Sequence, residues 1–456
     1  MKINTTIRDY FEDYLKSKHM TLHQFSQLSG INSGTLSSTL SGQRPIGVQQ
    51  LDRLTEGMGL NEGHFYDLYI VESFANANPD WRRLGPFLYR CAELNKVENI
   101  KETLSLVMDN LSYSPHLFDL AEQLFSEEKL EAARPLYHSV AESEKLQHSE
   151  RLALSQYRLF TIGLSNDQQN NQSLANQFEL FVDRLDEPYQ LDGLNDLINV
   201  FGSLRRWDKV EILAEQLRKK ATIQYEFKKI SRETETRTKK QVIFYVLYAY
   251  LVLGEVCFNN KEYEEGLEYI LLYKDHSWVK NPSDEEIRVI RQFEEWAEGN
   301  YYLYQLMSGK TDVLPSYLNY ISERENEVFP ALCAIVSAAN QFKINIHSIL
   351  EQYDSYFTYR EQVSHIGKIN EQYTSDQYGS LLAGLGTYYL TNKNYDKGME
   401  YLQRGLEFAM NNGNKDAMLD CLGLFGELRD SPNGEGNSTK AAILLEKISE
   451  RFSHPS

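Results

Sequence analysis

The chain has 456 residues, enough for two or three domains, and its 41% hydrophobic and 25% charged residues are typical of a folded globular protein. A formal net charge of −18 excludes a protein that coats nucleic acid over its whole surface, although one face could still bind it. We expect no secretory signal and no membrane-spanning stretch, because the best apolar run, residues 242–256, contains Tyr248, Tyr250 and Glu255. The four cysteines lie far apart without a Cys-x-x-Cys pair, so we expect reduced cytoplasmic thiols and no metal site.

Two short helices joined by a tight turn are predicted after a first amphipathic helix over residues 5–18. They occupy residues 21–42, with the sequence TLHQFSQLSGINSGTLSSTLSG. Thr21 and Gln24 have the spacing of a capping box, which indicates that a helix starts there. Gly30 can adopt the positive φ of the turn, and Gly42 can end the second helix. The inward-facing residues are expected to be Leu22, Phe25, Leu28, Leu36 and Leu40.

This pair of helices indicates a helix-turn-helix whose second helix enters a DNA major groove. Its outer face carries short hydroxyl side chains, which can contact phosphates or either base. Between residues 14 and 50 the charged residues are Lys16, Lys18 and Arg44, with no acid, so the local charge is +3 in an acidic chain. We expect the DNA contacts to be made by Thr21, Ser33, Thr35, Ser37, Ser38, Gln43 and Arg44.

Residues 4–62 resemble the Xre, Cro and repressor class of DNA-binding domains. The resemblance is carried by Phe25-Ser26, Gly30-Ile31, Thr35-Leu36-Ser37 and Leu40-Ser41-Gly42, followed by Gln43-Arg44-Pro45. Many members of this class have Gln and Arg on the groove-facing positions, where this chain has Leu22, Ser33 and Ser38. The resemblance therefore implies DNA binding without indicating a preferred sequence. The alternative is a degenerate domain of this class that serves only packing or dimerisation.

Helical periodicity continues beyond this region. Residues 48–58 and 61–74 are predicted helices, which complete an N-terminal domain over residues 1–75. Residues 76–80, NANPD, have the composition of a linker. Because residues 81–456 contain no strand-like alternation, the predicted fold class is all-α.

Residues 81–456 contain four divergent copies of a tetratricopeptide-like pattern, each predicting a pair of helices. The second helices of these pairs are predicted to begin at Leu130, Trp207, Tyr263 and Tyr395. Close approach of the two helices is expected at small residues, namely Ala121, Gly254 and Gly386. One hairpin cannot bury its own apolar face, so the hairpins are expected to stack into a right-handed α-superhelix.

Two segments interrupt the repeats. Residues 221–241 are too long and too polar for a repeat turn, and they predict an extended helix or a hinge. Residues 414–456, including a last helix over 439–452, are expected to cap the array or to form a dimer interface. Residues 433–440, NGEGNSTK, lack the spacing of a phosphate-binding loop and follow a helix rather than a strand. With no other catalytic motif in the chain, we expect neither enzymatic activity nor a cofactor.

The first helix of a tetratricopeptide hairpin presents certain positions to the concave groove of the array. Counting back from Trp207 gives Asp192, Asn195 and Asn199, and counting back from Tyr263 gives Tyr248 and Glu255. Amide side chains offer a donor and an acceptor, as a peptide backbone requires, and the acids suit a basic residue. These five residues are therefore predicted to bind a short extended peptide. The alternative is that the two asparagines are ordinary exposed helix residues.

A helix-turn-helix followed by such an array resembles the RRNPPA superfamily (Rap, Rgg, NprR, PlcR, PrgX and AimR) of peptide-sensing regulators. The resemblance implies a cytoplasmic homodimeric transcriptional regulator in quorum sensing, which binds double-stranded operator DNA and a short signalling peptide. In that family, asparagines on the inner helices hold the peptide backbone, which by position implies Asn195 and Asn199. Two alternatives stay open. The array could sense a protein partner, or the chain could be a Rap-like modulator of a phosphorelay protein.

Overall fold

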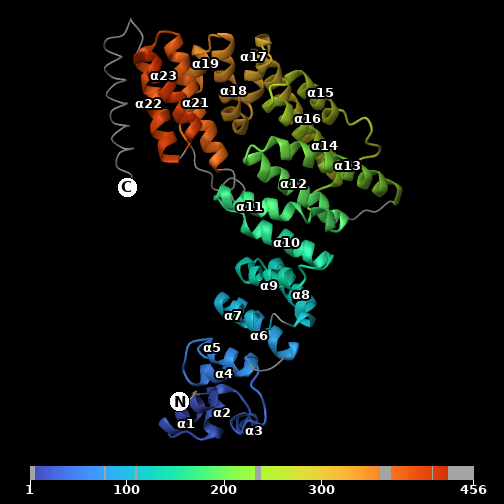
Figure 1. Ribbon diagram of the computed structural model, residues 1–456, viewed down its shortest axis with the longest axis vertical. Coiled ribbons are helices and arrows are strands. Elements are labelled where there is room, and N and C mark those ends of the chain that lie inside the picture. The colour runs from blue at the N-terminus through green and yellow to red at the C-terminus, as the bar shows by residue number, and fades with distance from the viewer. Residues whose placement is uncertain are drawn as a thin grey trace. The chain divides into compact units, whose positions relative to one another are not determined.

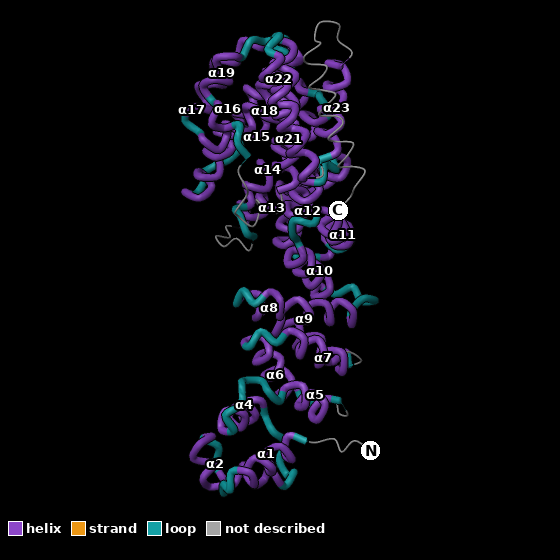
Figure 2. Tube along the Cα trace, turned by 90° about the vertical axis from the view of Figure 1, so that its left-hand side faces the viewer, coloured by secondary structure: helices purple, strands orange, loops and turns teal. Residues whose placement is uncertain are grey.

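The computed structural model describes residues 6–75, 79–107, 110–231, 238–359, 371–412 and 414–429. Within these ranges all regular elements are helices and no strand occurs, so the all-α prediction is confirmed (Figure 2). The chain divides into two compact units, residues 1–163 with 176–186 and residues 164–175 with 187–456. The predicted linker at 76–80 lies within the first unit, and residues 76–78 are outside the described residues.

The first unit contains ten complete helices among its described residues, labelled in Figure 1. They are α1 (Ile7–Ser17), α2 (Leu22–Ser29), α3 (Ser33–Leu40), α4 (Val48–Gly57), α5 (Tyr66–Phe74), α6 (Trp81–Glu93), α7 (Val97–Val107), α8 (Ser114–Ser126), α9 (Leu130–Ser143) and α10 (Glu150–Gly163). One cluster of buried side chains extends from Ile7 to Val140, so α1 to α9 share a hydrophobic core. Helix α11 (Gln168–Glu179) has residues in both units.

The described helices of the second unit are mostly longer. They are α12 (Glu187–Ser203), α13 (Trp207–Ser231), α14 (Val242–Asn259), α15 (Tyr263–Lys274), α16 (Asp284–Met307), α17 (Leu314–Ser322), α18 (Glu325–Phe342), α19 (His347–Gln352), α21 (Glu371–Thr391), α22 (Tyr395–Asn412) and α23 (Lys415–Arg429). Buried residues from Leu306 to Tyr401 form one core, and a smaller core forms between α21, α22 and α23.

Helices α2 and α3 begin and end where the sequence predicts. The Thr21 hydroxyl accepts the Gln24 N–H at 3.3 Å and the Gln24 side chain accepts the Thr21 N–H at 2.8 Å, which completes the predicted capping box. Gly30 has a φ of 63°, and Asn32 caps α3 by accepting the Gly34 N–H at 2.8 Å. Phe25 is fully buried and packs on Phe11 with 4.7 Å between ring centroids.

Two details of this region differ from the prediction. Leu28 does not face inward: it is 60% exposed, because the residue one turn after Phe25 is Ser29, which is buried instead. The helix predicted over 61–74 begins only at Tyr66, because Gly63 takes a positive φ of 69° and a turn precedes the helix.

The four predicted second helices begin at the predicted residues, and their turns share one geometry. In each turn the residue two positions before the new helix is left-handed, with φ between 54° and 65° at Glu128, Arg205, Lys261 and Lys393. The N–H of the next residue donates to the carbonyl five positions earlier in the chain, as Lys129 does to Leu124 at 2.9 Å. This is the Schellman closure of a helix end. Asn95 makes the same turn between α6 and α7, a hairpin that the repeat pattern did not identify.

The small residues of the repeats lie where two helices touch. A Cβ atom added to Gly254 would lie 3.5 Å from the Gly266 carbonyl, and one added to Gly386 would lie 3.4 Å from the Gly398 carbonyl. The predicted close approach within these two hairpins is therefore confirmed. Ala121 is fully buried at the equivalent position.

Two predicted segments lie only partly within the described residues. Of the segment 221–241, residues up to 231 continue α13 as an extended helix, and residues 232–237 lie outside the described residues. Of residues 414–456, only those to 429 are described, so the predicted last helix and the NGEGNSTK segment lie outside.

The expectation that no stretch reaches membrane-spanning length is wrong for α14, which has 18 residues and a mean hydropathy of 1.7. However, 67% of α14 is buried inside the protein, as in the core helix of a globular protein.

Candidate functional site

The outer surface of α3 and the loop after it carry the predicted DNA-contacting residues. Ser37, Gln43 and Arg44 are exposed, and Ser33, Thr35 and Ser38 are half-buried. The Ser38 hydroxyl donates to the Thr35 carbonyl at 2.9 Å, which holds it against its own helix. Thr21, also exposed, holds its hydroxyl in the capping box of α2.

The positive charge near α3 includes one residue, Arg8, that the sequence pattern did not indicate. Lys16 lies 3.5 Å from Glu12 and 3.9 Å from Asp13 on the same helix, so acids outside the counted window partly offset its charge. Arg8, which the sequence analysis missed, lies against the loop that follows α3: a Cβ on Gly42 would be 3.0 Å from its guanidinium. The Nε of Arg8 is buried without a hydrogen-bond partner. Arg8 and Arg44 are thus the cations that the structure places beside the end of α3.

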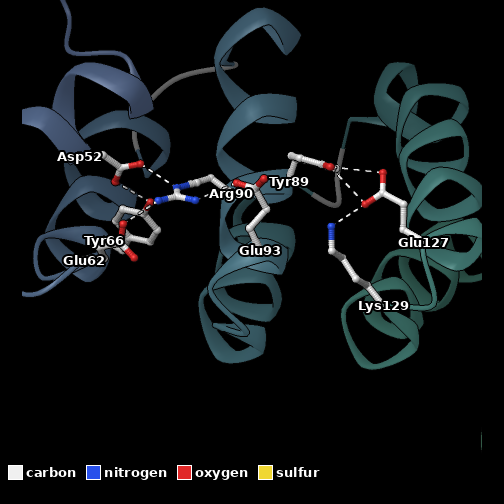
Figure 3. A network of polar contacts seen from close by, with 8 residues as sticks. All are labelled: Asp52, Glu62, Tyr66, Tyr89, Arg90, Glu93, Glu127 and Lys129. Carbon is white, nitrogen blue, oxygen red and sulfur yellow. Dashed lines mark hydrogen bonds and ion pairs between the residues drawn. The ribbon is translucent and has the colours of Figure 1, made fainter.

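A polar network fixes α4 and α5 to α6 in the first unit (Figure 3). Arg90 on α6 contacts Asp52 at 2.8 Å, Glu62 at 3.1 Å and Glu93 at 2.9 Å, while the Tyr66 hydroxyl donates to Asp52 at 2.7 Å. Burial and the Asp52 carboxylate raise the pKa of Tyr66, so its hydroxyl keeps the proton that it donates. Helices α4 and α5 are therefore joined to α6 by ion pairs as well as by the shared core.

The same network continues to the next hairpin. Tyr89 on α6 donates to Glu127 at 3.1 Å, and Lys129 contacts the same carboxylate at 2.5 Å. The Lys129 ammonium also lies 4.9 Å from the centre of the Tyr89 ring. Glu127 and Lys129 belong to the turn between α8 and α9. Helix α6 therefore contacts the elements before it and after it through two adjacent residues, Tyr89 and Arg90 (Figure 3).

In the second unit, α12 and α14 bring part of the predicted peptide site together. The Tyr248 hydroxyl on α14 donates to Asn199 Oδ1 on α12 at 2.6 Å. Asn195, one turn before Asn199, is only 7% exposed, and its Oδ1 has no hydrogen-bond partner. Its Nδ2 makes one long contact of 3.3 Å with Asp196. A buried acceptor without a partner costs free energy unless a ligand or water completes it.

Asp192 does not face a groove, contrary to the prediction. It is 2% exposed and its carboxylate accepts the Lys239 backbone N–H at 3.1 Å and the Tyr245 hydroxyl. Burial raises the pKa of Asp192, and these donors oppose that shift. Asp192 therefore stabilises the end of the segment between α13 and α14, a role that the position count could not distinguish from groove lining.

Glu255 lies on α14 in an environment that disfavours its charge. Burial raises the pKa of its carboxyl to about 7. Burial is the main cause that raises the pKa of Tyr373 on α21 to about 12. The Glu255 charge adds to this increase, and the Arg205 charge opposes it. The Arg205 guanidinium, in the α12–α13 turn, lies 5.9 Å from the centre of the Tyr373 ring on α21.

A pocket of about 470 Å³, which we call the main pocket, lies between α18, α21 and α23. Arg205 also reaches it from the α12–α13 turn, and its guanidinium lies 3.5 Å from Asp376 on α21. Asn340 on α18 donates to the Gly384 carbonyl at 2.8 Å, which holds the two walls together. The polar lining residues are Arg205, Ser337, Asn340, Gln377, Ser380, Thr387 and Asp420.

None of the main-pocket residues is among the site residues predicted from the sequence, although one signal is present. The offsets that give the predicted site from Trp207 also apply to the last hairpin. Counted back from Tyr395, they give Ser380, Ala383 and Thr387, and all three line the pocket. The lining residues on α18 had no such signal, because α18 does not belong to a recognisable repeat.

Among the described residues, one group could be considered for a metal ion: Cys257, Glu262 and Glu265. Burial raises the pKa of the Cys257 thiol to about 11, which disfavours the thiolate that a metal requires. Exposed acidic groups of this kind are common without a metal ion, so the group supports no metal assignment. No protein-family model matches the chain, and no curated protein is similar enough in sequence to count as a relative, so its function must be inferred from its own residues.

Proposed function

We propose that the protein is a DNA-binding transcriptional regulator that is controlled by a short peptide bound in its second unit. The observation that carries the proposal is the α2–turn–α3 pair, with α3 capped and its hydroxyl face outward beside Arg8 and Arg44. In helix-turn-helix proteins the second helix of such a pair lies in the major groove of DNA. In this proposal the hairpins from α6 onward form a tetratricopeptide-like superhelix, which we infer from their repeated turns and close helix contacts.

Two features of the second unit support peptide binding. Asn195 Oδ1 is a buried acceptor without a partner, next to the hydrogen-bonded pair of Asn199 and Tyr248. The main pocket is lined by amides, hydroxyls and the Arg205–Asp376 pair, which can engage a peptide backbone and its charged groups. An extended peptide presents alternating donors and acceptors, so it matches a lining of this kind better than an apolar ligand does.

The proposed mechanism is a shift between two conformations of a homodimer. Two copies of α3 must lie about 34 Å apart to read two half-sites on one face of DNA. A peptide that binds one conformation more tightly changes how often that spacing occurs. A coupling of about 1–3 kcal/mol would change the affinity for operator DNA about 5- to 150-fold.

The test of the DNA-binding half changes the charge of α3. Thr35→Glu combined with Ser37→Glu should abolish specific DNA binding, because two carboxylates would face phosphates. Ser105→Glu combined with Ser126→Glu adds the same charge on α7 and α8 and should leave DNA binding nearly unchanged. Retained binding by the α3 variant, with an unchanged thermal unfolding midpoint, would refute the assignment of this surface.

A further inference from the structure

Arg205 is the one cation among the described residues that line the main pocket. It lies at one end of the pocket, because its ion-pair partner Asp376 directly precedes Gln377, the first lining residue of α21. From Gln377 the lining continues along α21 to Thr387, which is about 15 Å of helix. A chain bound along this wall therefore has Arg205 beside one of its ends.

The backbone of Arg205 is fixed, whereas its guanidinium is open to a ligand. Arg205 takes the left-handed conformation of the α12–α13 turn, with a φ of 54°, and the Arg206 N–H closes the turn by donating to the Phe201 carbonyl at 2.9 Å. The Arg205 side chain is 44% exposed, and its contact with Asp376 is 3.5 Å long. A charge-assisted hydrogen bond between such groups is about 2.7–2.9 Å long, so this looser ion pair leaves the planar fork of the guanidinium able to bind a second carboxylate.

The amide side chains of the main pocket can accept hydrogen bonds from a peptide backbone. Asn340 donates its Nδ2 to the Gly384 carbonyl at 2.8 Å, and Gln377 donates its Nε2 to the Tyr373 hydroxyl at 3.1 Å. Each amide oxygen can then accept a backbone N–H of a ligand. The same oxygens repel a carboxylate, so within the described lining a carboxylate is favoured most beside Arg205.

The acids around Arg205 limit the charge of the group that it can hold. Asp376 lies beside the guanidinium, and Asp420 on α23 also lines the pocket. A group with two negative charges, such as a phosphate monoester, would face both acids with one cation to balance it. A carboxylate carries the smaller charge and can form two parallel hydrogen bonds with a guanidinium. The free C-terminus of a linear peptide is such a group.

We infer that Arg205 binds the C-terminal carboxylate of the regulatory peptide, whose chain ends at this side of the main pocket. The inference rests on the proposed function in taking the ligand to be a peptide. The peptide backbone then runs from Arg205 along α21 towards Thr387, with N–H groups near Gln377 and Asn340. The main pocket thus selects linear peptides with a free C-terminus over amidated or cyclic ones.

The binding test compares probes that differ in the charge of one end. N-acetyl-tetra-alanine has a free C-terminal carboxylate, and its C-terminal amide has nearly the same shape without the charge. Ligand-detected NMR titration of the full chain should show roughly 5- to 50-fold weaker binding of the amide, because it lacks the charge-assisted hydrogen bonds to a half-exposed guanidinium. Equal affinities, or no binding of the free acid, would overturn the inference. N-acetyl-dialanyl-aspartyl-alanine amide carries its carboxylate on a side chain, and tighter binding of this probe than of the free acid would also contradict it.

A variant of Arg205 locates the binding of the carboxylate. In Arg205→Gln the acid and amide probes should bind with equal affinity, because the variant removes the group that distinguishes them. Arg206→Gln removes the same charge from the next residue, whose guanidinium lies 2.9 Å from Asp208, and should preserve the difference between the probes. A difference that persists in Arg205→Gln would mean that Arg205 only shapes the pocket.

The outcomes separate this inference from the proposed function. If the probes and variants behave as expected but no peptide alters DNA affinity, the carboxylate site stands and the proposed function fails. If a peptide alters DNA affinity equally well as its C-terminal amide, the proposed function stands and the inference about Arg205 fails.

Discussion

Asn195 has an unusual position for an asparagine, because its buried Oδ1 lacks a partner. If a peptide supplies that partner, Asn195→Ala should weaken peptide binding about 5- to 150-fold, the equivalent of about 1–3 kcal/mol for a buried hydrogen bond. The free energy of unfolding should change by less than about 1 kcal/mol, since an unmade hydrogen bond is removed. Calorimetry and chemical denaturation measure the two quantities.

Two variants serve as controls for Asn195→Ala. Asn260→Ala, at the exposed end of α14, should leave peptide affinity unchanged. Leu194→Ala, on the same helix as Asn195 and fully buried, should lower the free energy of unfolding by about 2–5 kcal/mol. If Asn195→Ala binds the peptide as tightly as the natural protein does, the site has been placed wrongly.

The raised pKa of the Glu255 carboxyl leads us to expect that the free energy of unfolding depends on pH. Burial raises its pKa to about 7, above the value of about 4.3 in an unfolded chain. The folded protein thus binds this proton more tightly than the unfolded chain does. The stability that the protonated carboxyl contributes is fully present below about pH 4 and is lost as the pH rises to about 7.

Glu255→Gln cannot ionise and should remove this dependence. The thermal unfolding midpoint of the variant, relative to the natural protein, should therefore be higher at pH 8 than at pH 5. Glu264→Gln, at an exposed position of α15, should give the same small difference at both values. Parallel pH profiles for Glu255→Gln and the natural protein would show that the Glu255 carboxyl titrates normally.

At the scale of elements, the hairpins depend on close helix contacts. A Cβ on Gly386 would lie 2.5 Å from the Leu402 side chain, so Gly386→Ala should lower the free energy of unfolding by about 1–3 kcal/mol. Gly423 on α23 has open space around it, and there alanine should be neutral or should stabilise by about 0.5–1 kcal/mol. Denaturant unfolding compares the two variants. Equal effects would mean that the contact between α21 and α22 is looser than described.

The ion pairs of Arg90 are expected to help to hold α4 against α6. Its three carboxylate contacts are partly shielded, with 27% of its side chain exposed, so Arg90→Gln should cost about 1.5–3 kcal/mol and leave Asp52 without a cation. Lys101→Gln removes an exposed ion pair with Glu98 and should cost less than about 1 kcal/mol. Hydrogen exchange should become faster in α4 for Arg90→Gln alone. Unchanged exchange in α4 would mean that the apolar core suffices.

The elements were more predictable from the sequence than the site. The helix starts at Leu130, Trp207, Tyr263 and Tyr395 follow from local patterns. In each case a polar turn comes directly before the large residue at the helix start, so a few neighbouring residues determine the boundary. The burial of Asp192 does not, because it depends on Lys239 and Tyr245, about 50 residues away in the chain. The pocket walls on α18 are likewise set by tertiary packing rather than by periodicity. The DNA-contacting and peptide-binding roles stay predictions.

At the scale of the whole molecule, the net charge of −18 means that the proposed DNA contact would be confined to a small area. With Arg8 and Arg44 from each of two protomers, about four phosphates would be neutralised. The logarithm of the binding constant would then fall with a slope of about −4 against the logarithm of the salt concentration. Such weak contacts from each copy would make the affinity depend on two copies of α3 being correctly spaced, and a peptide could act on that spacing.

The most direct test is a fluorescence anisotropy titration of the full chain with DNA from upstream of its gene. The titration is repeated with the short peptides encoded downstream of the gene. We expect specific binding relative to a scrambled duplex, and a change in affinity of about 5- to 150-fold with one of the peptides. Equal affinity for the two duplexes, or an affinity that no peptide alters, would contradict the account of a peptide-controlled regulator.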